Sequence, residues 1–166
     1  MKAKRQKSNS QLLLEILEQG YQWKTWHGPN LVQSLRGVSA RQAAWRPQPG
    51  RHNIWEIVVH AAYWKYAVRR RLLGEPRGSF ALKGSNWFRR PAPGQGGETG
   101  EKAWAADRAL LGQEHGNLRA AVAQYLKGKP AQRALRMIFG VAFHDVYHAG
   151  QIRLLRRLYE DKRAKV

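Results

Sequence analysis

Residues 53–74 read NIWEIVVHAAYWKYAVRRRLLG, and this stretch decides the fold class. Its apolar residues recur every three or four positions, which is the period of a helix with one buried face; they are Ile54, Ile57, Ala61, Trp64, Val68 and Leu72. Asn53 is a favourable N-cap and Gly74 a favourable stop. The stretch therefore predicts a helix from Asn53 to about Leu73, with His60 bordering its apolar side.

Three further long helices are predicted on either side of this one. The first is capped by Ser10 and runs to about Gln19. The others cover about 101–126 and 141–159, and shorter segments are expected at 30–36, at 40–45 after Ser39, and at 132–139. No strand pattern and no internal repeat accompanies them. The prediction is all-α, an antiparallel four-helix bundle.

A long loop, residues 75–100, separates the second and third long helices. It is rich in Gly and Pro and has no apolar period. Loops of this length are uncommon in a compact domain unless they have a function. Because it carries Phe80, Trp87 and Phe88, we expect it to pack on the bundle. A lid over a pocket and a surface loop held by its aromatic residues are equally good interpretations.

The chain has 166 residues, enough for one domain with its own core. We expect a basic disordered tail at 1–9, the bundle at 10–160 and a C-terminal tail at 161–166. No stretch approaches the roughly 18 apolar residues of a membrane span. The early leucines at 12–14 are followed at once by Glu15, too short a run for a signal peptide. The sequence predicts a soluble, cytoplasmic protein.

The charge is strongly basic, with 30 Lys and Arg against 11 Asp and Glu, a formal +19. Such a field attracts polyanions, above all nucleic acid. The basic residues are spread over the whole chain, and no helix-turn-helix, zinc-finger or RNP signature accompanies them. We favour a solvated basic surface, with nucleic-acid binding as the alternative. The chain has no cysteine, so a metal site would need His, Asp, Glu or water.

His144 and His148 are four residues apart, so both side chains leave one face of a helix. At about 100° per residue, the inward stripe of that helix is predicted to be Met137, Val141, His144, His148, Gln151, Leu155 and Tyr159. A divalent metal would explain two titratable rings on an apolar face, with His60 as a third ligand from a facing helix. Three imidazoles would leave a coordination position for water or substrate. The alternative is that these are hydrogen-bonded core histidines.

The run His144-Asp145-Val146-Tyr147-His148 is similar to the zinc-protease pattern H-E-x-x-H with Asp in place of Glu. Asp is shorter by one methylene, and the surroundings of a peptidase cleft are absent, so we do not predict a protease. Asp145 is a weak candidate for a general base, a residue that orients a ligand, or a surface residue; we favour the second. Gln151 is a candidate for a hydrogen bond to a ligand ring or to substrate.

Four other residues are weaker candidates. His115 is predicted on the inner stripe of the third helix, as a fourth ligand or, preferably, a core histidine. His27 could line a pocket mouth, and His52 is expected in a loop. Arg71 could meet a substrate carboxylate, although an exposed arginine is the simpler interpretation.

The chain resembles the DinB/YfiT-like superfamily over about residues 10–160. The pattern that carries this resemblance is His144-x3-His148-x-Gly150-Gln151-Ile152, preceded by the histidine of Ile54-Trp55-Glu56-Ile57-Val58-Val59-His60. One DinB-like branch is also similar in Trp26-His27-Gly28-Pro29, Ala44-Trp45-Arg46-Pro47, Trp64-Lys65-Tyr66-Ala67-Val68 and Leu82-Lys83-Gly84-Ser85-Asn86-Trp87-Phe88.

The resemblance implies a four-helix bundle with a divalent metal, usually nickel or zinc, held by His60, His144 and His148, and often a homodimer. Some relatives transfer low-molecular-weight thiols such as bacillithiol, or use mycothiol to isomerise maleylpyruvate, with the thiol on the metal as thiolate. The first hypothesis is therefore a metal-dependent thiol transferase or hydrolase with a small-molecule substrate. The alternatives are a non-catalytic metal, small-molecule or nucleic-acid binding protein, and a site whose histidines are only structural.

Overall fold

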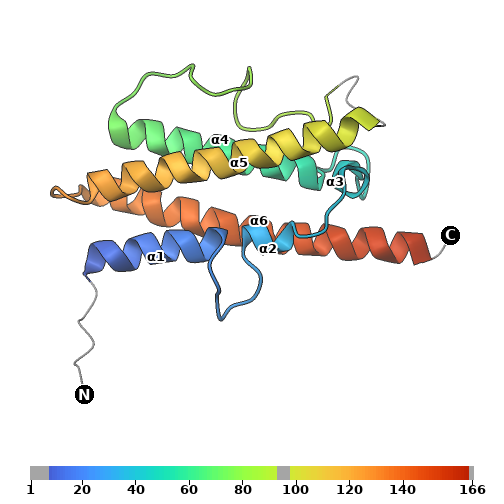
Figure 1. The fold of residues 1–166 in the computed structure, drawn as a ribbon, viewed down its shortest axis with the longest axis horizontal. Helices are drawn as coiled ribbons and strands as arrows, with labels where there is room; N and C mark the ends of the chain where they lie inside the picture. Colours follow the sequence, from blue (N-terminus) through green and yellow to red (C-terminus); the bar gives the residue numbers. More distant parts are fainter. Residues whose placement is uncertain (1–7, 93–97, 165–166) are drawn as a thin grey trace.

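A computed structural model describes residues 8–92 and 98–164, which form six helices and contain no strand. They are α1 (Asn9–Tyr21), α2 (Leu31–Ser34), α3 (Ala40–Ala44), α4 (Ile54–Leu73), α5 (Glu98–Tyr125) and α6 (Gln132–Ala164). The four long helices form a bundle, and the two short ones lie between α1 and α4 (Figure 1). The predicted all-α bundle is confirmed. Within the described part, no helix is long and apolar enough to cross a membrane.

The helix ends follow local capping signals. The side chain of Asn53 accepts a hydrogen bond from the backbone N–H of Glu56 at 2.8 Å, and Gly74 closes α4 in the left-handed conformation with φ of 70°. Both ends of α4 lie where the sequence predicts them. The predicted cap of α1 is wrong by two residues, because Ser8 rather than Ser10 caps it. Gln11, three residues after Ser8, completes a reciprocal capping box that Ser10 lacks.

The last helix is longer than predicted. α6 is continuous from Gln132 to Ala164, so the separate element expected at 132–139 does not exist. Gly140 does not interrupt the helix, since a single interior glycine costs only about 1 kcal/mol and its neighbours Ile138 and Val141 are buried. α6 also continues past residue 160, where we expected the bundle to end. The tail expected at 1–9 lies mostly outside the described residues.

The helix directions differ from an all-antiparallel bundle. α4 and α5 are neighbours that run the same way, and α1 and α6 run the opposite way (Figure 1). Two contacts show this parallel course: Trp55 Nε1 donates to Asp107 Oδ2 at 2.7 Å, and Arg69, later in α4, pairs with Glu114, later in α5. A chain that joins two parallel helices must return along the length of the first. The long loop after α4 makes this return, as in bundles with crossover connections.

The core consists of two apolar clusters. One surrounds Trp55 and Trp104 and includes α2 and α3; the other packs Leu17 of α1 against Leu118 and Ile138. Polar groups are buried between them, on every long helix. Nζ of Lys65 pairs with Oδ2 of Asp145, and both side chains have 0% exposure. The surface interpretation of Asp145 is therefore wrong, and its carboxylate contacts a lysine rather than a histidine.

His115 belongs to the same buried layer. Its ring stacks on Tyr21 with centroids 3.6 Å apart, and its Nε2 lies 3.5 Å from Oε1 of Glu18. Nζ of Lys65 lies 4.8 Å from the centroid of the same Tyr21 ring. The preferred interpretation of His115 as a core histidine agrees with these contacts, and its role as a fourth ligand is wrong.

Candidate metal centre

Three histidines from two helices converge on one point. Nε2 of His144 lies 3.1 Å from Nε2 of His60 and 3.0 Å from Nε2 of His148. One ligand atom from each ring lies within 4.8 Å of the others. Nitrogens bound to one zinc ion at about 2.0–2.1 Å stand close to such a separation. Among the described residues, this is the one group of three His, Asp or Glu side chains that could hold a metal ion.

The histidines lie at the edge of the buried face of α6, not at its centre as predicted. The fully covered positions are Ile138, Asp145 and Ile152. At 100° per residue, His148 and His144 are turned about 60° and about 100° away from Asp145. This edge position lets both rings line a pocket.

The Nδ1 atoms fix the rings and their tautomers. Nδ1 of His60 lies 2.8 Å from the carbonyl oxygen of Asn86, and Nδ1 of His148 lies 2.6 Å from Oε1 of Gln151. Both partners are acceptors, so each Nδ1 carries the proton and each Nε2 presents a lone pair. Metal-binding histidines are oriented by such bonds. The role of Gln151 as partner of a candidate ligand ring is thus the one the geometry favours.

A divalent cation fits this donor set. With two Nε2 atoms as obligate acceptors, His144 can donate one proton to only one of them. Its Nδ1 is buried and has no hydrogen-bond partner among the described residues. A cation at the point of convergence would accept all three lone pairs at once. The residues present therefore fit the metal that the sequence predicts.

Burial keeps the three rings neutral. It lowers the pKa of His148 to about 4 and, together with the nearby His148, His60 and Lys65, lowers the pKa of His144 to about 3. Burial also lowers the pKa of His60, despite the bond to Asn86. Neutral imidazole is the form that binds metal, so at neutral pH none of the three rings has to lose an extra proton before it can bind one.

The loop after α4 supplies one wall of the site. The Trp87 indole is stacked between the rings of His52 and His60, with centroids 3.6 and 3.8 Å away. Oδ1 of Asn86 also accepts a hydrogen bond from Nε1 of Trp64 at 3.0 Å. This part of the loop covers the site, as a lid would, and it is held there by aromatic packing, as in the alternative interpretation. His52 and Trp87 were not among the residues predicted for the site.

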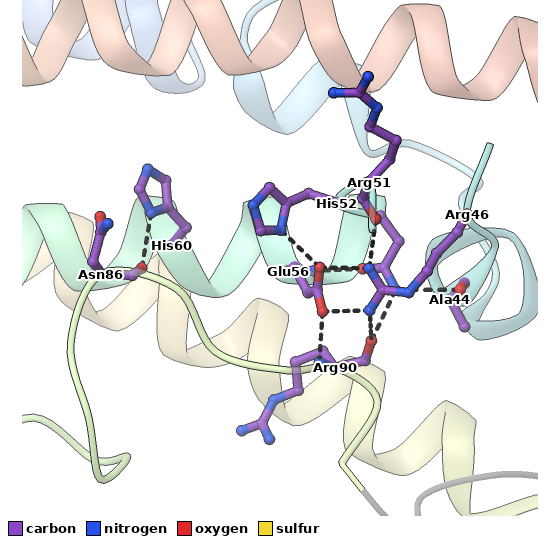
Figure 2. Close-up of polar contacts among 9 residues, drawn as sticks. Ala44, Arg46, Arg51, His52, Glu56, His60, Asn86 and Arg90 are labelled. Atoms are coloured by element: carbon purple, nitrogen blue, oxygen red, sulfur yellow. Dashed lines mark hydrogen bonds and ion pairs between the residues drawn. The ribbon is translucent and has the colours of Figure 1, made fainter. Parts of the chain in front are cut away.

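Glu56 forms hydrogen bonds with the loop that precedes α4 and with the loop that follows it (Figure 2). Its Oε2 accepts from Nη1 of Arg46 at 2.8 Å and lies 2.9 Å from Nδ1 of His52. Its Oε1 accepts from Nη2 of Arg46 and from the backbone N–H of Arg90 at 3.3 Å. Burial alone would raise the pKa of Glu56, but these hydrogen bonds outweigh it and lower the pKa. Glu56 is thus a fixed anion that positions His52.

A pocket of about 600 Å³ opens beside the three histidines. Its apolar lining includes Ile57, Leu154, Leu155 and Leu158, and its polar lining includes Tyr147 and Gln151. The volume lies within the usual range for small-molecule sites.

Comparison with known families agrees with this geometry. Residues 25–152 match the family model of the DinB superfamily. The chain belongs to the DinB superfamily. The matched segment contains His60, His144 and His148, and the predicted family resemblance is confirmed. No curated protein and no solved structure matched the chain.

In this DinB-superfamily chain, two other predicted candidates lie away from the pocket. His27 is exposed and lines a separate depression with Pro29. The guanidinium of Arg71 lies 5.8 Å from the centroid of the Trp64 ring. Arg71 borders a smaller depression of about 190 Å³ that reaches His144 from another side.

Proposed function

We propose that His60, His144 and His148 hold a divalent metal ion, nickel or zinc, and that the protein is a metal-dependent transferase for a low-molecular-weight thiol. One observation carries the proposal: three neutral imidazoles present their Nε2 atoms together at the wall of a pocket of about 600 Å³. A bound metal would act as a Lewis acid and lower the pKa of a bound thiol or water, so that either could lose its proton near neutral pH.

The chain's own residues favour thiol over water as the nucleophile. No Asp or Glu lines the pocket within the described part of the chain, and Asp145 is occupied by Lys65 in the core. A hydrolase would have to use His52, which lines the pocket and is held by Glu56, as the base that takes the proton of water. A free thiol has a pKa of about 8.5, far below that of water at about 15.7, so it can lose its proton without such a base. Hydrolysis remains the second form of the proposal.

The remaining roles concern orientation. Asn86 and Gln151 hold the rings of His60 and His148 through their Nδ1 protons. The amide nitrogen of Gln151 also donates to the hydroxyl of Tyr147 at 3.0 Å. The Tyr147 hydroxyl can therefore offer its own proton to a substrate at the pocket.

A thiol-transfer assay tests the proposal. Protein loaded with Ni²⁺ or Zn²⁺ is given cysteine and 1-chloro-2,4-dinitrobenzene; the thiolate sulfur bonds to the ring carbon, chloride leaves and the thiol proton goes to solvent. We expect a rate above that of the metal-free protein, lost in His144→Ala and retained in the exposed control His27→Ala. Loaded wild type that binds thiol but shows no metal-dependent rate would instead indicate a binding protein.

We also propose a homodimer, as the family resemblance implies, and a cytoplasmic location, as the sequence predicts. Sedimentation equilibrium of the untagged protein should give twice the monomer mass, and cell fractionation should recover it with the cytoplasmic proteins. A single species of monomer mass at micromolar concentration would contradict the dimer.

A further inference from the structure

We propose that the pocket beside the histidines takes an amphiphilic anion, with its apolar body between α4 and α6 and its negative group on Arg51. The inference rests on the proposed function in one respect: the other end of the ligand would bind the metal held by the three histidines. It adds the class of substrate and the residue that selects it.

The pocket wall favours an apolar body. Leu154 and Leu158 line it and are 58% and 40% exposed, which is high for leucines on one helix. Ile57 faces them from α4, and Trp87 adds an aromatic surface. A ligand that covers these side chains would gain about 25 cal/mol for each Å² of apolar surface removed from water.

Arg51 is the one lysine or arginine among the described residues that line this pocket. Its backbone is held on both sides: the carbonyl oxygen accepts from Nη1 of Arg46 at 2.6 Å, and the N–H donates to the carbonyl of Gln48 at 3.2 Å. Figure 2 shows its guanidinium directed away from Glu56, on the side where α6 passes. The base of the side chain is fixed, and the charged end is available to a ligand.

No acidic group of the pocket neutralises this arginine. Both oxygens of Glu56 are occupied by Arg46, His52 and the N–H of Arg90. In the segments 8–92 and 98–164, no carboxylate lines the pocket and none pairs with Arg51. Guanidinium groups bind carboxylates and phosphates through paired hydrogen bonds. An anionic ligand is therefore the expected partner of Arg51.

The positions of the two polar ends set the length of the ligand. His60 lies seven residues after the cap Asn53, which is about 10 Å along α4, and Arg51 precedes this cap. The flexible side chain of Arg51 can cover part of this distance. A ligand with its metal-binding group at the histidines and its anion at Arg51 therefore needs a chain of about six carbons.

The first test uses Co²⁺-loaded protein and two thiols, 6-mercaptohexanoate and 6-mercaptohexanol, which differ in the terminal carboxylate. Visible absorption of the Co²⁺–thiolate reports binding. We expect wild type to bind the acid about tenfold more tightly than the alcohol, as a charge-assisted hydrogen bond provides. The ratio should fall to about one in Arg51→Gln, remain partly in Arg51→Lys, and persist in Arg71→Gln. It should also decrease with added salt.

The second test removes the metal. Calorimetric titration of metal-free protein with octanoate and with octanol should give the same preference for the acid in wild type and its loss in Arg51→Gln. Equal binding of acid and alcohol to wild type, a preference that survives Arg51→Gln, or one that is lost in Arg71→Gln would overturn the inference. Failure to bind Co²⁺, with the octanoate preference intact, would instead overturn the proposed function.

Discussion

The carbonyl oxygen of Asn86 accepts a hydrogen bond from Nδ1 of His60 at 2.8 Å, so a loop residue orients a ring on α4, 26 positions earlier in the chain. The backbone of Asn86 has a φ of 66°, in the left-handed region that few non-glycine residues adopt. The loop after α4 is therefore part of the metal centre, and its backbone geometry bears on metal affinity.

A change at Asn86 should affect metal binding through this carbonyl. Asn86→Val places a β-branched residue at positive φ, which moves the backbone, and we expect metal affinity to fall about tenfold, as for other partners of ligand histidines. Asn86→Gly permits the same φ and should lose much less. Competition with a chromophoric chelator measures both. Equal affinities for the two variants would contradict a role for the carbonyl position.

Gln151 should act on the metal through His148. Gln151→Leu removes the acceptor of the Nδ1 proton, and we expect metal affinity to fall by about 10- to 100-fold. Gln151→Glu retains an acceptor and should preserve or increase the affinity. The same competition assay applies. An unchanged affinity in Gln151→Leu would show that the 2.6 Å contact does not orient the ring.

The Lys65–Asp145 pair should affect stability and not metal binding. Both side chains are fully buried, so Lys65→Met leaves an uncompensated carboxylate and should cost about 3–5 kcal/mol in the free energy of unfolding. The double variant Lys65→Met with Asp145→Leu should recover much of this loss. Urea unfolding measures both. Normal stability but lost metal in Asp145→Asn would restore a direct role for Asp145 at the metal.

The buried histidines predict a loss of stability in acid. In the folded protein the pKa values of His115, His144 and His148 are about 2, 3 and 4, chiefly because of burial, whereas the unfolded chain should titrate near 6.5. Between these values the unfolded chain binds more protons, so stability falls as the pH decreases below about 6.5.

At pH 5.5 each of these rings should cost about 1 kcal/mol relative to pH 7.5. Guanidinium unfolding of the metal-free protein at the two pH values measures the difference. The exposed-histidine variant His27→Ala should show the same pH dependence as wild type. Equal unfolding free energies at both pH values would indicate that the rings are not buried as described.

Local signals in the sequence predict much of the fold. Asn53 and Gly74 mark the ends of α4 because capping depends on residues adjacent in the chain. The separate elements predicted at 132–139 and 141–159 meet at Gly140, where α6 does not end, since tertiary packing holds the helix together across one glycine. The parallel course of α4 and α5 could not be deduced, because it depends on how the loop crosses the bundle.

The site shows the same division. The pairing of His144 with His148 can be predicted from their spacing, but the residues that surround the site cannot. Trp87 reaches His60 only through the path of the loop, which has no periodic pattern. One signal was available for His52, which is four residues before Glu56 and so at the spacing of a helical ion pair. Lys65 gave no signal, since a lysine on a helix is usually solvated.

Metal content tests the central claim most directly. Untagged protein, purified without chelators and analysed by plasma mass spectrometry, should contain about one nickel or zinc ion per chain, consistent with three converging imidazoles. His60→Ala, His144→Ala and His148→Ala should each lose most of it, and His115→Phe and His27→Ala should retain it. Wild type that holds no more metal than the three triad variants, even after incubation with Ni²⁺ or Zn²⁺, would contradict the account.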